Sequence, residues 1–282
     1  MEIRREQMIG QGNTAEIYRL GDNKILKLFR SGLYKGIIEK EYHNGIIIQN
    51  VLECVPKVYE MVEIKGRHGI IYEEIHGKDM LKVMMGSLWK INIYAKKLAH
   101  YHLSIQKPVM DNLSTVKEKL EADLHHVNLL SDENKEIVRK YLKQLPDGNE
   151  LCHFDFHPGN VMIANNKKVV LDWMTACRGD VCADVARTCL LLKYGEVSHA
   201  PWIIRRVISF FQHHIYKVYI REYLTISQRS MADINRWELP VAAARLCEWI
   251  SENEKKILLE LVNKHCNEIN GGNSLYKQGN KL

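Results

Sequence analysis

The sequence lacks an apolar run long enough to cross a membrane. No stretch of the 282 residues approaches the run of about 18 apolar residues that a transmembrane helix needs. The segment Met1–Glu6 is mostly charged and has none of the apolar centre of a secretory signal peptide. We therefore expect a soluble globular protein with no membrane partner.

Cysteine spacing typical of metal or redox sites is also absent. The chain has seven cysteines and no C-x-x-C pair. An odd count in a chain of this length argues against both a disulfide framework and a structural zinc site. We expect reduced cysteines that pack as small hydrophobes, and therefore a cytoplasmic location.

Charge of one sign is not concentrated anywhere. Forty Lys and Arg against 34 Asp and Glu give a net charge of +6, without a run of five or six like charges. This mild excess suits a phosphate-bearing ligand as well as a nucleic acid. A nucleic-acid-binding protein is a lesser alternative, which depends on the net charge and on the basic, aromatic segment 205–221.

The periodicity of the chain changes near Gly77. Before it, alternating apolar residues and turn residues predict five strands and one helix: strands at 7–11, 15–20, 24–29, 58–62 and 69–75, and a helix at 36–49. After it, helical spacing dominates, with short strands at 151–153, 161–163 and 169–171. The pattern predicts an α+β fold of two lobes, with an N-terminal antiparallel sheet plus one helix at 1–76, a mostly helical lobe at 77–270 and a flexible tail at 271–282.

The strongest chemical signal is the segment His153–Asn160, which is followed by Asp172 at the end of an apolar run. It places Asp155 and Asn160 five residues apart. Phosphoryl transfer needs one carboxylate near the acceptor hydroxyl and oxygen ligands for magnesium beside the phosphates. The spacing is similar to that of the catalytic loop and the metal-binding Asp of protein kinases.

Two N-terminal features support this interpretation. A glycine-containing turn lies between the first two predicted strands. Lys27 lies inside an apolar strand, where its burial needs an anionic partner, and the next helix offers Glu39 and Glu41. Glycine turn, strand Lys, helix Glu, D-x-x-x-x-N and strand-end Asp follow the kinase order. Their joint presence predicts an ATP site.

The H-x-D-x-H-P-x-N form at 153–160, with Asp172-Trp173 and a later Gly179-Asp180-x-x-x-Asp184, resembles the aminoglycoside phosphotransferase family. This family of small-molecule kinases has a protein-kinase-like fold and includes choline and ethanolamine kinases. The resemblance implies ATP and Mg²⁺ as cofactors and Asp184 as a buried support of the catalytic loop. It implies a catalytic carboxylate, Asp155; magnesium ligands, Asn160 and Asp172; a phosphate-binding lysine with its partner, Lys27 and Glu41; a glycine turn, Gly10, Gln11, Gly12, Asn13 and Thr14; and an adenine-binding hinge, Glu73, Glu74 and Ile75.

Departures from the protein-kinase pattern favour a small-molecule acceptor. Phe154 replaces the Arg that precedes the catalytic Asp in protein kinases, and in this family the position is often Gly. Only twelve residues separate Asp172 from Asp184, and no A-P-E follows, so a peptide-docking segment has little room and a protein substrate is not expected. Three residues are candidate substrate contacts, each with a structural alternative: His157, which could instead bind within its loop, and Arg245 and Glu248, which could instead pair across one helical turn.

The sequence thus predicts an ATP-dependent transfer of the γ-phosphate to a hydroxyl of a small molecule. The acceptor could be an antibiotic such as an aminoglycoside, an amino alcohol or a sugar. The basic 199–222 region disfavours a polycationic aminoglycoside. The main alternative is a catalytically silent, nucleotide-binding pseudokinase, although such proteins commonly lack at least one of the four residues Lys27, Asp155, Asn160 and Asp172, all of which this chain has.

Overall fold

The computed structural model describes residues 4–12, 14–110, 112–164, 167–195 and 202–271. Asn13 of the predicted glycine turn and residues 272–282 of the predicted tail lie outside this part. Contacts divide the chain into two compact units. The first comprises 1–94, 109–113 and 155–176, and the second comprises 95–108, 114–154 and 177–282. The boundary expected after His76 stays a prediction.

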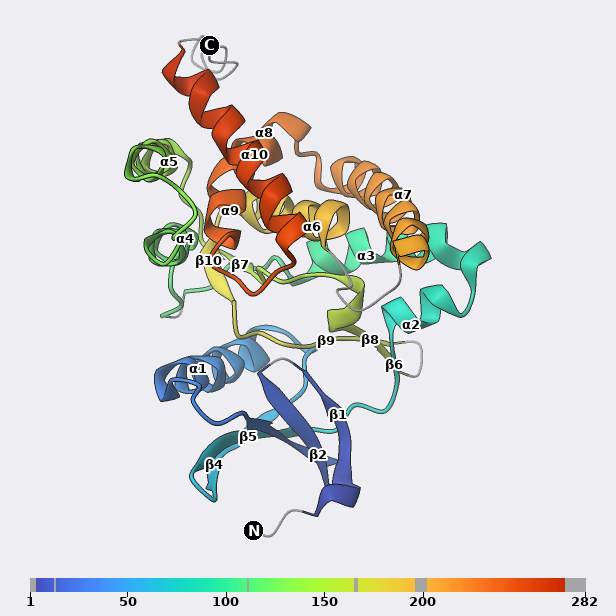
Figure 1. Ribbon diagram of the computed structural model, residues 1–282. Helices are drawn as coiled ribbons and strands as arrows, with labels where there is room; N and C mark the ends of the chain where they lie inside the picture. The colour runs from blue at the N-terminus through green and yellow to red at the C-terminus, as the bar shows by residue number, and fades with distance from the viewer. Residues whose placement is uncertain (1–3, 13, 111, 165–166, 196–201, 272–282) are drawn as a thin grey trace. The chain divides into compact units, whose positions relative to one another are not determined.

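The first unit is built on a five-stranded antiparallel sheet in the order β1-β2-β3-β5-β4. A single helix packs against β4 and β5 (Figure 1). Gly45 allows this helix to approach closely, because a Cβ there would meet a Val58 methyl group at 2.6 Å. The elements are η1 Arg5–Gln7, β1 Met8–Gln11, β2 Ala15–Gly21, β3 Lys24–Phe29, α1 Lys35–Val51, β4 Val58–Ile64 and β5 Arg67–Glu73.

The two faces of the sheet have separate apolar clusters, because successive side chains of a strand point to opposite faces. Ile70 belongs to the cluster that includes Ile38 of α1. Its neighbour Ile71 belongs to the other cluster, with Leu26. Lys27 is paired in register with Ile70, so its side chain lies on the face that α1 covers.

A second, three-stranded sheet in the order β6-β8-β9 completes the first unit. Asp79 begins the adjoining helix by accepting a hydrogen bond from the Lys82 N–H. The elements are β6 Lys78–Asp79, α2 Met80–Met85, η2 Leu88–Lys90, η3 Pro158–Asn160, β8 Val161–Ala164 and β9 Lys167–Val170. α3 Ile91–Ile105 starts in this unit and continues into the second.

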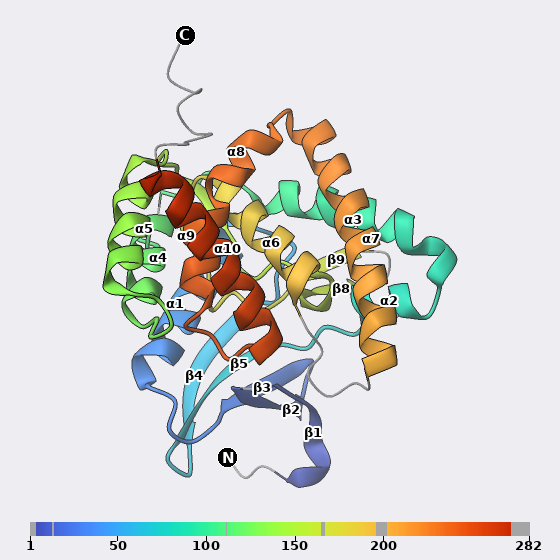
Figure 2. The same ribbon diagram turned by 45° about the horizontal axis from the view of Figure 1, so that its top comes forward.

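The second unit is mostly helical. α4 lies beside α5, α10 packs on α5 and α9, and α6 contacts α7, α8 and α9 (Figures 1 and 2). Side-chain N-caps explain where several helices begin: Thr115 for α4, Ser131 for α5, Asp180 for α6, Ser230 for α8 and Ser251 for α10. The elements are α4 Val116–His125, α5 Asp132–Gln144, β7 Glu150–Cys152, β10 Cys177–Gly179, α6 Val181–Tyr194, α7 Trp202–Ser227, α8 Met231–Arg236, α9 Glu238–Arg245 and α10 Glu252–Asn270.

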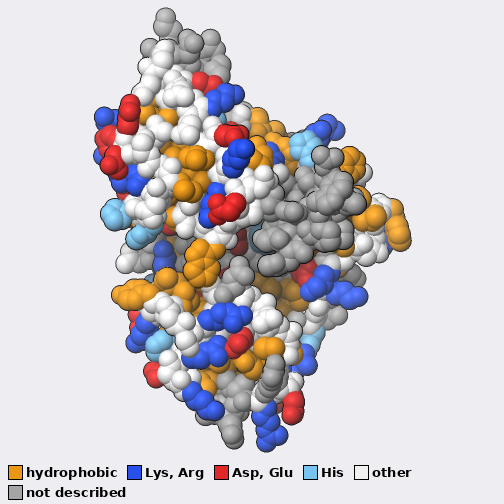
Figure 3. All heavy atoms as spheres, viewed as in Figure 1, with side chains coloured by type: hydrophobic (Ala, Val, Ile, Leu, Met, Phe, Trp, Pro, Cys, Tyr) orange, Lys and Arg blue, Asp and Glu red, His pale blue; other side chains and the backbone are white. Residues whose placement is uncertain are grey.

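The predicted α+β class, with an N-terminal antiparallel sheet, one helix and a helical C-terminal part, is confirmed. Helix α4 begins at the Thr115–Glu118 capping box, and His126 is its C-cap. The short strand β10, which pairs with β7, is not in the prediction. Within the described residues, no helix has the length and apolarity to cross a membrane. On the face seen in Figure 3, basic and acidic side chains are interspersed among hydrophobic and uncharged groups.

Candidate active site

Lys27, Glu41 and Asp172 meet in the first unit. Lys27 on β3 donates a 2.7 Å hydrogen bond from Nζ to Glu41 Oε1, on the buried face of α1. The same Nζ lies 3.2 Å from Asp172 Oδ1, just after β9. The strand lysine expected to need an anion therefore has two, and Glu41 rather than Glu39 is the helix partner. Glu39 instead pairs with Lys35 on an exposed face.

Electrostatics keep Lys27 charged. Burial alone would lower the pKa of Lys27, but attraction to Glu41 and Asp172 raises that pKa above its ordinary value. Lys27 is therefore a cation at neutral pH. Tyr72, at the end of β5, donates a hydrogen bond to the same Glu41 oxygen at 2.9 Å. Burial and the nearby Glu41 charge raise the pKa of Tyr72 well above its ordinary value, so the hydroxyl stays protonated and remains a donor.

The loop from Asp155 to Asn160 is closed by its own side chains. Asn160 Nδ2 donates to the Asp155 carbonyl at 2.9 Å and to Asp155 Oδ2 at 3.0 Å. His157 accepts the Gly159 N–H at Nδ1, and its Nε2 lies 3.7 Å from Asp155 Oδ2. The His157 ring thus binds within its loop, and a contact of this ring with substrate stays a prediction.

The two predicted magnesium ligands are joined through the backbone. The Leu171 N–H donates to the Asn160 carbonyl at 2.9 Å, which places Asn160 beside the residue that precedes Asp172. The Asn160 side-chain nitrogen donates to Asp155, which leaves the side-chain oxygen as the atom that could bind a metal ion. Of the Asp172 side chain, 43% is exposed. Hard oxygen donors of this kind fit Mg²⁺, which commonly binds one or two protein groups and takes its other ligands from water and phosphate.

The residue before Asp155 has an unusual backbone. Phe154 has a φ of 63°, a left-handed conformation that costs about 1–3 kcal/mol in a residue other than glycine. In the second unit, Asp184 accepts the N–H groups of His153 and Phe154, both at 2.8 Å. Arg187, one turn later on α6, donates to the Phe154 carbonyl at 3.2 Å. These contacts hold the backbone of residues 153 and 154 in place.

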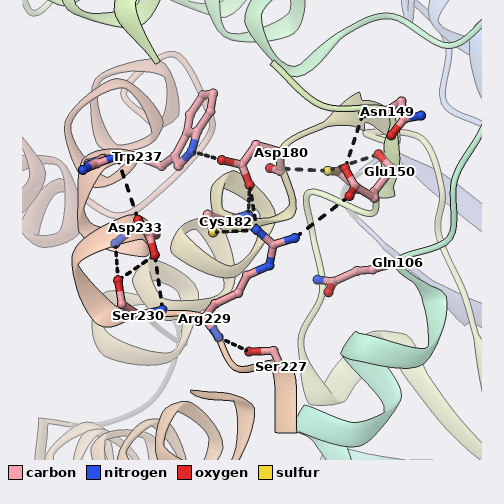
Figure 4. A network of polar contacts seen from close by, with 12 residues as sticks. Gln106, Asn149, Glu150, Asp180, Cys182, Ser227, Arg229, Ser230, Asp233 and Trp237 are labelled. Carbon is pink, nitrogen blue, oxygen red and sulfur yellow. Dashed lines mark hydrogen bonds and ion pairs between the residues drawn. The ribbon is translucent and has the colours of Figure 1, made fainter. Parts of the chain in front are cut away.

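Helix α6, which carries Asp184 and Arg187, is itself anchored at its N-terminus. Figure 4 shows Asp180 between Trp237 and Arg229. Asp180 Oδ1 accepts the Cys182 N–H at 2.9 Å, and its Oδ2 accepts from Trp237 Nε1 at 3.0 Å. A hollow of about 350 Å³ opens beside Arg229. Its lining holds none of the predicted site residues.

The predicted glycine turn and hinge also take definite positions. The Gly12 N–H closes the turn between β1 and β2 by donating to the Ala15 carbonyl at 2.8 Å. In the hinge, the N–H groups of Glu73 and Glu74 donate to the carbonyls of Lys57 and Asn23. These two N–H groups are therefore engaged within the protein, and the contact of Ile75 with adenine stays a prediction. Gly10 and Gln11 end β1, and Thr14 accepts the Arg30 N–H before β2.

Arg245 and Glu248 belong to an ionic network of the second unit. Arg245 donates to Glu254 Oε1 from Nε at 2.6 Å and to Glu248 Oε2 from Nη1 at 2.7 Å. Glu248 also accepts from Arg187 at 2.8 Å. Arg245 is buried, and its contacts with Glu254 and Glu248 give it a structural role in this network. Glu248 is more exposed, and its contact with substrate stays a prediction.

We expect Arg245→Met to lower the free energy of unfolding by about 3 kcal/mol, because Glu254, only 2% exposed, would keep a buried charge without its cation. Chemical denaturation measures the effect. The matched control is Arg236→Met, which removes an exposed arginine 3.9 Å from Asp233 and should cost at most about 1 kcal/mol. Equal losses for the two variants would contradict a structural role for Arg245.

Three residues of the site are not in the sequence prediction. Asn44 on α1 binds the turn after Asp172, Tyr72 binds Glu41, and Arg187 binds Phe154. Asn44 lies among the buried residues of α1, but the sequence does not indicate which group a buried polar side chain binds. Arg187 follows Asp184 by three residues, which places both on one face of a helix, and this spacing is the one signal that could have pointed to it.

The comparisons with known proteins agree with this geometry. The profile of the phosphotransferase enzyme family matches residues 7–212. A search of curated proteins found no match. Similar solved structures include an aminoglycoside-3'-phosphotransferase of type VIII, with 15% identity over 87% of this chain and 92% of that one and a TM-score of 0.61.

Other structures with the same fold have different acceptors in their names. A putative fructosamine-3-kinase from Haemophilus somnus has 15% identity over 91% of this chain and 89% of its own, with a TM-score of 0.57. A choline kinase from Cryptosporidium parvum has 11% identity over 96% of this chain and 92% of its own, also with a TM-score of 0.57. At these identities the likeness establishes the fold, and the match over 7–212 establishes the family. The chain therefore belongs to the phosphotransferase enzyme family and is a kinase-type enzyme, as its resemblance to the aminoglycoside phosphotransferases predicts.

Proposed function

We propose that the protein transfers the γ-phosphate of ATP to a hydroxyl group of a small molecule. The observation that carries the proposal is the assembly, within one compact unit, of a charged Lys27 bound to Glu41 and Asp172 and of Asp155 bound to Asn160. The residues come from β3, α1 and the loops on either side of the β8–β9 hairpin.

In this proposal the nucleotide binds between the glycine turn and the hinge of the region 1–76, with residues 77–270 providing the acceptor lobe. Lys27 holds the α- and β-phosphates. Glu41 keeps Lys27 extended along the sheet face by accepting its hydrogen bond. The Glu41 carboxylate is in turn held by the Tyr72 hydroxyl. Adenine binds the hinge through Ile75 and through the carbonyl side of Glu73.

Asn160 and Asp172 hold Mg²⁺ through oxygen atoms. When bound, the ion neutralises charge on the β- and γ-phosphates. Asp155 orients the acceptor hydroxyl and accepts its proton as the new O–P bond forms and the bond to the ADP oxygen breaks. Positioning and charge neutralisation supply most of the acceleration in phosphoryl transfer, so the reaction does not require a strong base.

The acceptor is proposed only as a class. A polycationic aminoglycoside would need an acidic pocket, whereas Glu248 of the late helices is already bound by two arginines. This arrangement favours an amino alcohol, a sugar or a less cationic antibiotic. We place the enzyme in the cytoplasm, which suits its seven free cysteines.

The first test is nucleotide binding. We expect calorimetry to show that ADP binds more tightly with Mg²⁺ than without it, and that Asp172→Ala removes this magnesium-dependent gain, because the variant loses a carboxylate ligand. The matched control is Glu39→Ala, which removes an exposed carboxylate of α1 and should leave the gain unchanged.

Absence of nucleotide binding by the folded wild-type protein would overturn the proposal. Binding of MgATP without hydrolysis, and without transfer to amino alcohols, sugars or antibiotics, would support the pseudokinase alternative. Salt-dependent binding to RNA or DNA without any response to nucleotide would support the nucleic-acid alternative.

A further inference from the structure

A single buried amide joins α1 to the turn that follows Asp172. Asn44 Nδ2 lies 3.2 Å from the Trp173 carbonyl oxygen, 3.4 Å from that of Ala176 and 3.5 Å from that of Met174. Only 2% of Asn44 is exposed. The side chain has two N–H donors, which are thus shared among three carbonyl groups of one turn.

The same helix face also holds Lys27. Glu41 precedes Asn44 by three residues, so the two side chains project from neighbouring positions of α1. Glu41 contacts the ammonium group of Lys27, and Asn44 contacts the backbone that carries Asp172. One turn of α1 therefore contacts both Lys27, the proposed phosphate-binding residue, and the backbone that follows Asp172, the proposed magnesium ligand.

The turn needs such support because Asp172 has a strained backbone. Its φ is 62°, in the left-handed region that residues with a side chain rarely adopt. On one side, the Leu171 N–H is fixed to Asn160. On the other side, the Trp173 indole Nε1 donates to the Val170 carbonyl at 3.0 Å. Asn44 adds the contacts that tie residues 173–176 to α1.

We propose that Asn44 is a positioning residue of the phosphotransferase, and that it fixes the Asp172 carboxylate for magnesium relative to the Lys27–Glu41 pair. The inference rests on the proposed function. Asn44 is buried and bonded to the backbone of residues 173–176, so in this proposal it acts through Asp172 rather than on a ligand directly. Its loss should therefore weaken binding of magnesium nucleotide specifically, rather than nucleotide binding in general.

The experiment compares ADP binding with and without Mg²⁺ in wild type and in Asn44→Leu, by calorimetry on protein shown by circular dichroism to be folded. We expect the dissociation constant with Mg²⁺ to rise about tenfold, within the range of coupling between residues of one hydrogen-bond network. The metal-free constant should change much less. Asn44→Ser, which keeps one donor, should recover part of the loss, and it carries the test if Asn44→Leu does not fold. The control is His43→Leu, at an exposed position of the same helix.

A double-mutant cycle separates positioning from general stabilisation. In the Asp172→Ala background, Asn44→Leu should have no further effect on the magnesium-dependent gain, because the carboxylate that Asn44 positions is gone. Equal gains in wild type and Asn44→Leu, or additive losses in the cycle, would overturn the inference while leaving the proposed function intact. If wild type binds no nucleotide, the proposed function fails and this inference fails with it.

Discussion

Asp155→Asn is expected to slow phosphate transfer by about 10²–10⁴-fold, the usual contribution of a general acid–base group, without weakening nucleotide binding. The amide has nearly the shape of the carboxylate. Its oxygen can still accept from Asn160 Nδ2, which lies 3.0 Å from Asp155 Oδ2. The loop should therefore keep its conformation, while the group that orients the hydroxyl and takes its proton is lost.

The separation between binding and turnover follows from the contacts of Asp155. Its hydrogen bonds described above come from Asn160, a proposed magnesium ligand. Asp155→Asn keeps an oxygen that accepts from Asn160 Nδ2, so the proposed magnesium ligands should keep their positions. Asp172→Ala should therefore impair binding, whereas Asp155→Asn should impair the chemical step. A mutation that lowers kcat at constant nucleotide affinity removes an interaction made in the transition state.

The measurement is steady-state ATP hydrolysis, which needs no known acceptor, followed by transfer to whichever acceptor a screen identifies. Calorimetry with ADP and Mg²⁺ checks that binding is retained. The control is Asp132→Asn at the exposed start of α5, which should keep full activity. An Asp155→Asn enzyme with wild-type turnover would show that Asp155 is not the catalytic carboxylate.

The charged residues Lys27, Glu41 and Asp172 can be predicted from the sequence, whereas the hydrogen bonds that orient the site cannot. Lys27 was predictable because a cation inside an apolar strand needs an anion, and the helix that follows supplied only two acids for the role. The choice between Glu39 and Glu41 is explained by the fold: Glu41 lies on the buried face of α1, while Glu39 pairs with Lys35 on the exposed face.

Side-chain contacts to backbone groups could not be predicted from the sequence. Asn44 and Arg187 both bind carbonyl groups, and every residue has a carbonyl, so no residue type marks the partner. The φ angles of Phe154 and Asp172 were equally hidden, because neither residue is a glycine. Phe154 adopts its left-handed backbone with the support of Asp184 and Arg187.

That support leads to the largest expected effect on stability, which is for Asp184→Asn. Asp184 is fully buried, accepts two backbone N–H groups, and lies 2.9 Å from His102 Nε2. His102 in turn contacts the Tyr219 hydroxyl at 2.6 Å through Nδ1. An amide at position 184 would direct its own N–H₂ group at one of these donors. We expect a loss of about 5 kcal/mol, because a buried carboxylate that accepts two backbone N–H groups is removed from a site that offers these donors no other acceptor of the same charge.

The pH dependence of this contribution has a definite sign. Burial acts to raise the pKa of Asp184, but attraction to His102 and the hydrogen bonds from His102 and the His153 N–H together hold that pKa below its ordinary value of 3.8. A carboxyl whose pKa is lower in the folded state stabilises the fold above its unfolded pKa. The contribution is therefore complete at neutral pH and is lost as the pH falls below about 4 through the folded-state pKa.

Denaturant unfolding of wild type and Asp184→Asn between neutral pH and pH 3 measures both effects. The difference between the two proteins should be constant above about pH 5 and shrink below pH 4, because only wild type loses the carboxylate there. Glu222→Gln is the control, since it removes a more exposed acid paired with Lys96 and His100, and it should cost at most about 1 kcal/mol. A difference that grows on acidification would mean that Asp184 is protonated in the native state, and the loop at 153–154 would then owe its conformation to Arg187 and packing rather than to a buried charge.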